Sequence, residues 1–382
     1  MKTVLFIIDS LNCGGAEKSL VSLLPHLDYS QVDVSLSIVC RGGVFEQYLP
    51  TQVRLIPFPE LSPVGRFFSN ALLSVSRRVL TILGTKRHGA ELAWICKRRF
   101  VPVFKEHFDV AVAYQQGFPT YFLADKVNAD KKIAWINTDL ENAGYRLHFN
   151  RPFYDRMNCV CAVSDALCEK LSFTGFVNKE QLTLVKDILP VDLIRKMATE
   201  PLAFDFVSDR PLVLTVGRMV PPKNYPLAIE TARFLSKKGV PFTWVFVGEG
   251  AERKDIERRI ERYHLSDSVI VAGRQINPYP FFKCCDIYVQ TSSFEGFGLT
   301  LSEAKILHKP IVTTNFPSAY DQITDGENGL ITEMTPESLA DGILRLIDNP
   351  SLKEKLVNAT RQEDNLTAIT ESKLVNHLLL DD

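Results

Sequence analysis

Short apolar runs alternate with amphipathic segments along the first half of the chain. Runs of this kind are typical of parallel strands that are buried on both faces. A glycine turn and an amphipathic segment at about 16–27 follow the first run, and Ser164 is placed to cap a later helix. We expect strands at 4–8, 32–40, 53–56, 110–114, 133–136 and 159–163. Strands that alternate with helices predict a parallel sheet covered on both faces.

The same alternation restarts in the second half of the chain. Pro190 and the segment 204–211 interrupt the pattern, so we interpret the stretch near 190–208 as a connector between two domains. Beyond it we expect strands at 212–216, 243–247, 269–272, 287–290 and 310–313, and helices at 226–238, 251–263 and 299–307. The prediction is an α/β protein of two Rossmann-like domains, 1–195 and 196–364, facing each other across a cleft.

Composition and charge narrow the class of protein. The 382 residues are 46% apolar and 23% charged, which is ordinary for a globular chain of two domains. The net charge is −1, from 44 basic and 45 acidic residues, so nucleic acid is not an expected partner. No stretch reaches the ~18 apolar residues that span a bilayer, and the first apolar run stops at Asp9 without a signal-peptide cleavage pattern. We expect a cytoplasmic protein.

The spacing of cysteine and histidine gives no sign of a metal site. The eight cysteines form no C-x-x-C pair, and the seven histidines are scattered. We interpret the cysteines as small buried thiols in a reducing compartment. The chain also lacks a D-x-D triplet. We therefore expect no metal and no resident cofactor.

The most specific stretch is 292–303, where a strand end, a glycine loop and a helix follow one another. Gly296 and Gly298 let the backbone approach a ligand closely, and the N–H groups at the helix N-terminus suit a phosphate or sugar oxygens. Glu295 lies in the loop, and Glu303 lies about one turn into the helix, where its carboxylate can bind a ribose diol. Taken alone, Glu295 could simply cap the helix and Glu303 could be solvated.

The glutamate pair with its internal Gly-Phe-Gly resembles that of retaining GT-B glycosyltransferases, especially family four. Other marks of the family follow in order along the chain: Gly14-Gly15, Gly217-Arg218, Lys223-Asn224, Gly248-Glu249-Gly250, Gly273-Arg274 and 325–329. Gly248 and Gly250 could equally serve only a strand–helix turn. The ordered set covers nearly the whole chain and is strongest over 212–332.

The resemblance implies a role for each matching residue. Glu295 would contact the donor sugar as a catalytic residue, Glu303 the nucleotide ribose, and Arg218 and Lys223 the diphosphate, without a metal. The remaining donor-binding residues on this basis are Gly15, Arg274, Gly296, Phe297, Gly298 and Leu299. The N-terminal domain would take the acceptor, the C-terminal domain would bind the nucleotide sugar, and a helix at about 365–382 would pack back on the first domain. Fixed cations suit a leaving diphosphate, which gains negative charge in the transition state.

One position departs from the family pattern. Asn137 follows a strand where many relatives carry a histidine that contacts the donor sugar. An amide can hydrogen-bond but cannot titrate, so Asn137 differs from that histidine in the chemistry it offers. We keep Asn137 as a catalytic candidate and assign Tyr114, Gly117 and Asp139 to the acceptor side.

Residues 62–107 break the strand–helix rhythm. They hold nine basic and two acidic residues, a net charge of +7, with aromatic and aliphatic residues interleaved. Such a segment could lie on the anionic inner membrane, beside a lipid-linked acceptor. Alternatively its apolar residues pack inward and its charges are solvated, and the sequence leaves both interpretations open.

The predicted function is transfer of a sugar from a nucleotide-diphosphate sugar to a glycan or lipid-linked acceptor, in capsule, O-antigen or exopolysaccharide assembly. Two alternatives remain open. A nucleotide-sugar epimerase shares the architecture, and a non-catalytic nucleotide-sugar-binding protein would fit Asn137. A dehydrogenase is disfavoured because no G-x-G-x-x-G follows the first strand.

Overall fold

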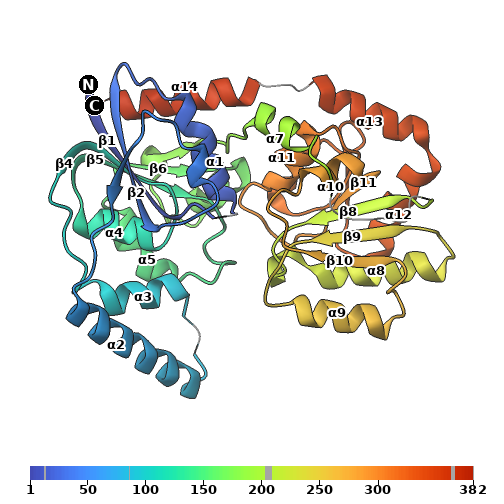
Figure 1. Cartoon of the computed structure of the whole chain (residues 1–382), viewed down its shortest axis with the longest axis horizontal. Coiled ribbons are helices and arrows are strands. Elements are labelled where there is room, and N and C mark those ends of the chain that lie inside the picture. The colour runs from blue at the N-terminus through green and yellow to red at the C-terminus, as the bar shows by residue number, and fades with distance from the viewer. Residues whose placement is uncertain (13, 86, 203–208, 363–365, 382) are drawn as a thin grey trace. The chain divides into compact units, whose positions relative to one another are not determined.

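The computed structural model describes residues 1–12, 14–85, 87–202, 209–362 and 366–381. Cys13, Lys86 and residues 204–208 of the expected connector lie outside the described residues. The chain forms two compact units, drawn in Figure 1. Unit 1 comprises Met1–Leu189 and Thr367–Asp382, and unit 2 comprises Pro190–Leu366.

Unit 1 is built on a seven-stranded parallel sheet with the order β3-β2-β1-β4-β5-β6-β7. Its strands are β1 (Lys2–Ser10), β2 (Val32–Cys40), β3 (Arg54–Pro57), β4 (His107–Ala113), β5 (Asn128–Ile136), β6 (Cys159–Ala162) and β7 (Leu182–Leu184). The central strand β1 pairs with β2 through Val4 and Val34, and with β4 through Val4 and Val110. Residues 4–8 of β1 are wholly buried, as expected for an apolar run in the middle of a covered sheet.

Helices cover the sheet of unit 1. They are α1 (Gly15–Leu23), α2 (Pro63–Ile82), α3 (Gly89–Lys97), α4 (Phe118–Lys126), α5 (Leu147–Tyr154), α6 (Asp165–Phe173) and α14 (Leu366–Leu380), with short 3-10 turns at Leu24–His26, Glu46–Tyr48 and Lys179–Gln181. The cap predicted for α6 is confirmed, since Ser164 Oγ accepts a hydrogen bond from the N–H of Leu167 at 3.2 Å.

The C-terminal helix α14 is fastened to unit 1 by hydrogen bonds. Lys2 Nζ donates to Leu380 O at 2.7 Å, and the N–H of Asp28 donates to Asn376 Oδ1 at 2.9 Å. The N–H of Lys186 donates to Glu371 Oε2 at 2.9 Å. The last helix of the chain therefore completes the unit that contains the first strand (Figure 1).

Unit 2 holds a six-stranded parallel sheet with the order β10-β9-β8-β11-β12-β13. Its strands are β8 (Leu212–Val216), β9 (Thr243–Val247), β10 (Val269–Gly273), β11 (Ile287–Gln290), β12 (Ile311–Thr314) and β13 (Leu330–Thr332). Its helices are α7 (Val191–Met197), α8 (Tyr225–Lys237), α9 (Arg253–Arg262), α10 (Tyr279–Cys284), α11 (Leu299–Ile306), α12 (Pro336–Asp348) and α13 (Pro350–Gln362), with 3-10 turns at Pro221–Lys223 and Pro317–Ala319. The first six strands of each unit thus share one order, in which the first and fourth strands are neighbours.

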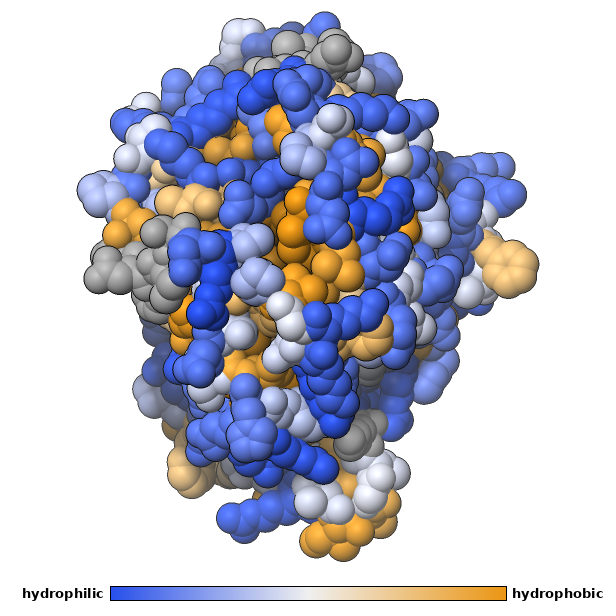
Figure 2. Space-filling model, turned by 90° about the vertical axis from the view of Figure 1, so that its right-hand side faces the viewer, coloured by the Kyte–Doolittle hydropathy of each residue, from blue (hydrophilic) through white to orange (hydrophobic). Residues whose placement is uncertain are grey.

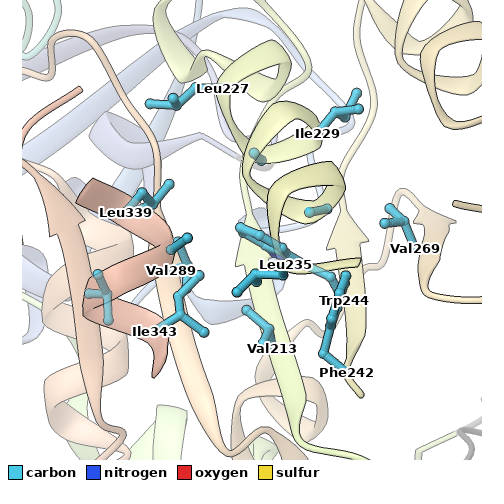
Figure 3. Close-up of a cluster of buried hydrophobic side chains, with 14 of the residues drawn as sticks. Val213, Leu227, Ile229, Leu235, Phe242, Trp244, Val269, Val289, Leu339 and Ile343 are labelled. Carbon is cyan, nitrogen blue, oxygen red and sulfur yellow. The ribbon is translucent and has the colours of Figure 1, made fainter. Parts of the chain in front are cut away.

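The core of unit 2 lies between its sheet and the helices α8 and α12 (Figure 3). Leu235 of α8 and Ile343 of α12 are fully buried against it. Trp244 of β9 is also buried, and its indole N–H donates to Thr215 Oγ1 at 3.0 Å, so the one polar atom of this large side chain is satisfied. The face of the molecule drawn in Figure 2 is mostly hydrophilic, with hydrophobic residues gathered between polar ones.

The exposure of the cysteines agrees only in part with the sequence interpretation. Cys96, Cys159, Cys161 and Cys285 are buried, but Cys40 and Cys284 are exposed, so the reading of all the cysteines as buried thiols was wrong. Both exposed residues lie at an element end, where the apolar run that suggested burial has already stopped.

None of the helices in the described parts of the chain combines the length and the hydropathy that a bilayer crossing needs.

Two glycines of unit 2 allow the loops after neighbouring strands to touch. A Cβ on Gly248, whose φ is +153°, would lie 1.9 Å from Gly217 O, and one on Gly250 would lie 2.2 Å from Met219 O. The loops are joined there, because the N–H of Met219 donates to Glu249 O at 2.8 Å. Gly248 and Gly250 therefore have a packing role, holding the turn after β9 against the turn after β8.

Replacing Gly248 by alanine should displace the turn after β8 and lower the free energy of unfolding by about 2 kcal/mol or more, because the new methyl group meets a backbone carbonyl that cannot rotate away. Gly89→Ala is the control, since no atom lies within 4 Å of a Cβ there, and it should change stability by less than about 0.5 kcal/mol. Thermal unfolding of both variants measures the difference. Equal melting temperatures would contradict the packing role.

Candidate functional site

The topology of unit 2 places the predicted motif at the carboxyl edge of its sheet. β8 and β11 pair in parallel through Val213 and Ile287, and the chain leaves them toward opposite sides of the sheet. Ligands of open α/β sheets bind at such a switch point, beyond the carboxyl ends of the two strands. The loop after β8 contains Gly217 to Asn224, and the loop after β11 contains Thr291 to Gly298.

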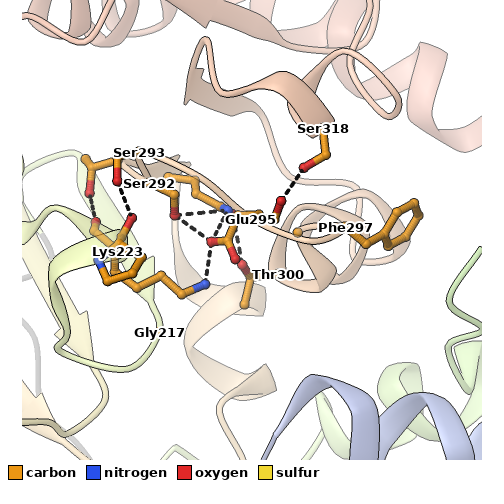
Figure 4. Close-up of polar contacts among 12 residues, drawn as sticks. Gly217, Lys223, Ser292, Ser293, Glu295, Phe297, Thr300 and Ser318 are labelled. Carbon is orange, nitrogen blue, oxygen red and sulfur yellow. Dashed lines mark hydrogen bonds and ion pairs between the residues drawn. The ribbon is translucent and has the colours of Figure 1, made fainter. Parts of the chain in front are cut away.

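At this switch point Lys223 and Glu295 form a partly buried ion pair (Figure 4). Lys223 Nζ lies 2.5 Å from Glu295 Oε1, and the two side chains are 20% and 14% exposed. The same oxygen accepts hydrogen bonds from Ser292 Oγ at 2.6 Å and from Gln290 Nε2 at 3.0 Å. Three donors on one oxygen fix the carboxylate in place, and no hydrogen bond between described residues engages its other oxygen, Oε2.

The two loops that supply the pair are joined by their own backbones. Thr291 Oγ1 donates to Lys223 O at 2.8 Å, and the N–H of Ser293 donates to Pro222 O at 2.8 Å. Asn224 ends this turn in the left-handed conformation, with φ of +50°. The position of Lys223 is therefore set by β11 as much as by β8.

The glycine loop leads directly into α11. Gly298, with φ of +92°, precedes the helix, and no side chain caps its N-terminus. No hydrogen bond between described residues uses the N–H groups of 296–300. The loop is held from its other side, where Ser318 Oγ donates to Glu295 O at 3.2 Å and Gln322 Nε2 donates to Phe297 O at 2.5 Å. Unused amides at a fixed helix N-terminus make a site for an anion.

Glu303 lies on α11 and is fully buried. Tyr279, at the start of α10, donates its hydroxyl to Glu303 Oε1 at 3.0 Å. Burial of a carboxylate is costly unless hydrogen bonds from the protein replace those from water. The hydrogen bond from Tyr279 is one such replacement, and it also orients the carboxylate of Glu303. The second predicted glutamate is thus part of the same loop and helix as Glu295, in a dry environment.

The structure places the other candidates at the carboxyl edges of the two sheets. Arg218 follows β8 and Arg274 follows β10, and both are exposed. The guanidinium of Arg218 makes no ion pair or hydrogen bond with described residues. Gly15 lies in unit 1, as the first residue of α1.

The corresponding edge of unit 1 holds the acceptor-side candidates. Tyr114 follows β4, is 2% exposed and stacks on Trp135 with ring centroids 4.8 Å apart. Asn137 follows β5 and donates through Nδ2 to Tyr114 O at 2.9 Å. Gly117, with φ of +88°, opens α4, and Asp139 is ion-paired with Lys170 at 2.7 Å. Tyr114 and Asn137 therefore meet at the sheet edge, while Asp139 is engaged with Lys170.

Tyr114 belongs to a buried polar cluster with Ser19 and Asp187, and the sequence gave no signal for Asp187. Burial raises the pKa of Asp187 to about 7, partly offset by a hydrogen bond with Ser19, whose hydroxyl lies 2.9 Å from that of Tyr114. Buried oxygens of Gln115, Asn137 and Asp187 have no partner among the described residues. All three residues follow the carboxyl ends of strands, where ligands of open α/β sheets bind and can complete such hydrogen bonds.

The sequence also gave no signal for Tyr279, Gln290 and Gln322, which orient the two glutamates and the glycine loop. Their roles depend on contacts between segments far apart in the chain. Ser292 was within the predicted motif but had been given no role. The described residues contain no group of three or more His, Cys, Asp or Glu side chains that could hold a metal ion.

Comparison with known proteins bears on both units. Residues 199–363 match the family model of glycosyl transferases group 1, which confirms the resemblance to glycosyltransferases for this part of the chain. The chain is 30% identical over 154 residues to the alpha-D-kanosaminyltransferase of Streptomyces kanamyceticus, a match that covers 39% of this chain and 40% of that protein. Matches to three of the curated relatives span 34% to 58% of their lengths.

One relative and one solved structure match almost end to end. The N-acetylgalactosamine-N,N'-diacetylbacillosaminyl-diphospho-undecaprenol 4-alpha-N-acetylgalactosaminyltransferase of Campylobacter jejuni is 21% identical over 365 residues, 94% of both chains. Anabaena HepE in complex with UDP and glucose superposes with a TM-score of 0.73 over 99% of both chains at 17% identity. The structural likeness confirms the predicted fold class, the α/β GT-B fold.

Asp187 should make the stability of the folded protein depend on pH. Its folded-state pKa of about 7 lies above its ordinary value of 3.8, so the folded protein binds the proton more tightly than the unfolded chain. Stability is therefore lost as the pH rises from about 4 to about 7. Asp187→Asn removes this loss of stability at higher pH. The melting temperature of the variant should therefore rise relative to that of the parent chain between about pH 5 and about pH 8. A constant difference across this range would show that the carboxyl is not held neutral.

Proposed function

We propose that this chain, whose residues 199–363 match group 1 glycosyl transferases, moves a sugar from a nucleotide-diphosphate sugar to a glycan or lipid-linked acceptor. The observation that carries the proposal is the Lys223–Glu295 pair at the β8/β11 switch point, beside the unused amides of 296–300. A cation, a fixed carboxylate and free N–H donors at one strand edge suit a ligand that combines phosphates with sugar hydroxyls.

Lys223, Arg218 and the loop amides are proposed to bind the diphosphate. The ammonium of Lys223 has three donors and gives one to Glu295, which leaves two for phosphate oxygens. Arg218 adds an exposed guanidinium at the end of the neighbouring loop. These groups would stabilise the negative charge that grows on the leaving diphosphate, so the proposal needs no divalent metal.

Glu295 and Glu303 are proposed to bind the two sugars of the donor. Glu295 Oε1 is fully engaged, so Oε2 is the oxygen left to accept a hydroxyl of the transferred sugar. Glu303 would accept the ribose hydroxyls, with Tyr279 orienting its carboxylate. Because Glu303 is buried, this second contact requires neighbouring side chains to move when the nucleotide binds.

The chemistry that we propose is transfer with retention of anomeric configuration. The bond from the anomeric carbon to the phosphate oxygen breaks, the bond to the acceptor oxygen forms, and the leaving phosphate takes the acceptor proton. Asn137 cannot take that proton, but its Oδ1 is buried without a described partner and can accept a hydrogen bond from a sugar hydroxyl. Unit 1 is proposed to hold the acceptor, against the polar cluster around Asp187.

The proposed setting is surface-polysaccharide assembly in the cytoplasm. Relatives named for lipopolysaccharide core biosynthesis, capsular polysaccharide biosynthesis and transfer to a diphospho-undecaprenol acceptor support it. The base of the nucleotide and the sugar are left to experiment.

A donor screen tests the proposal. UDP-, GDP-, ADP- and TDP-sugars are compared by thermal shift, and one class should stabilise unit 2 by about 2.7 kcal/mol at 100 times its Kd. Lys223→Met should abolish that shift, because it removes the cation of the diphosphate site, while Lys254→Met, at an exposed lysine of α9, should keep it.

Glu295→Gln, assayed with the same donor, separates binding from transfer. It should retain nucleoside diphosphate binding and lose at least about tenfold in sugar transfer or slow donor hydrolysis. A screen in which no nucleotide sugar binds, or in which Lys223→Met responds like the parent chain, contradicts the proposal. Binding without transfer or hydrolysis would indicate a binding protein, and epimerised free donor would indicate an epimerase.

A further inference from the structure

The helix α2 of unit 1 buries little of its surface. Of its 20 residues only Gly65 and Ser69 are buried. A Cβ on Gly65 would lie 3.2 Å from the Cβ of Phe100, and Ser76 Oγ lies 3.8 Å from Cys96 Sγ of α3. The same strip of the helix includes the half-buried Leu73 and Leu80, and the helix lies beside α3 at the edge of the unit (Figure 1).

A second, exposed side of α2 carries large apolar side chains, which a surface helix usually turns toward the core. Their exposed fractions run from 46% to 82%, and Phe67 and Phe68 are 70% and 55% exposed. Their spacing of three and four residues places them on one face. The set, which we call the α2 face, is Val64, Phe67, Phe68, Leu72, Val75, Val79, Ile82 and Leu83, the last at the C-cap. It holds 8 of the 14 exposed large apolar side chains of the described residues, so this exposure is concentrated rather than scattered.

The charge around the α2 face is basic. Residues 62–107 carry nine basic and two acidic residues. Glu91 is fully buried and accepts hydrogen bonds from Asn150 Nδ2 and the N–H of Arg146, and Glu106 is ion-paired with Arg54 at 3.6 Å. Neither acid compensates the exposed Arg77, Arg78, Arg98 and Arg99. An apolar face with uncompensated cations at its border is complementary to an anionic, apolar surface.

We propose that the α2 face binds an anionic lipid bilayer, with its aromatic and aliphatic side chains in the interface and its arginines on the headgroups. No described helix is able to cross a bilayer, so the helix would lie in the plane of the membrane. A second copy of this chain is a poorer occupant, because a two-fold contact would bring two equally basic faces together. The inference rests on unit 1 alone and does not depend on the proposed sugar transfer.

Vesicle co-sedimentation of the full chain tests this surface without any donor or acceptor. The chain should bind vesicles of phosphatidylcholine with phosphatidylglycerol about tenfold or more tightly than vesicles of phosphatidylcholine alone, and added salt should weaken the binding. Phe67→Ser with Phe68→Ser should reduce the binding about tenfold through lost insertion, and Arg77→Ala with Arg78→Ala should remove the preference for the anionic lipid. Phe173→Ser is the matched control, because this phenylalanine of unit 1 is 94% exposed and lies outside the α2 face.

All of the substituted side chains are exposed, so the variants should keep the melting temperature of the parent chain. The proposal is overturned if the parent chain does not bind anionic vesicles, or if the α2 variants bind them as tightly as the parent chain does. It is also overturned if light scattering shows a dimer that Phe67→Ser with Phe68→Ser converts to a monomer without any vesicle binding, since the α2 face would then join two copies.

Discussion

The ion pair between Lys223 and Glu295 is the constraint on which the proposed donor site depends. A carboxylate that is 14% exposed is stable only where donors replace the water it has lost, and Lys223, Ser292 and Gln290 all bond its Oε1. The pair also links the loops after β8 and β11, so the cation proposed to bind a phosphate and the carboxylate proposed to bind a sugar are held next to each other. A ligand then meets a site that is already arranged, which is the condition for electrostatic stabilisation of a transition state.

The two units use one strand order for different chemistry. In unit 2 the carboxyl edge presents cations and unused amides, which suit phosphates. In unit 1 the same edge holds carboxyl groups that bind a proton more tightly than usual, because burial raises the pKa of Asp187 to about 7, and burial with the nearby Glu17 raises that of Asp9 to about 7. A topology that directs strand ends toward a ligand therefore leaves the kind of ligand to the side chains after each strand.

Much of the fold could be predicted from the sequence, because local patterns of apolar and polar residues determine it. The strands 212–216, 243–247 and 287–290 were predicted to the residue, since buried parallel strands are short continuous apolar runs. The contact between Tyr279 and Glu303, and the burial of Asp187, depend on how distant segments pack, and no local pattern encodes them. The α2 face was ambiguous for a related reason. The sequence showed apolar residues along this helix, but only the structure shows that the side with Gly65 and Ser69 packs inward and that most of the large apolar side chains stay exposed.

The most direct test of the central claim is the position of a nucleoside diphosphate in crystals grown with it. The account predicts that the phosphates lie within hydrogen-bonding distance of Lys223 Nζ and of the N–H groups of 296–300, beyond the carboxyl ends of β8 and β11, with the Lys223–Glu295 pair in place. A nucleotide bound elsewhere, with Lys223 contacting only Glu295, would contradict it.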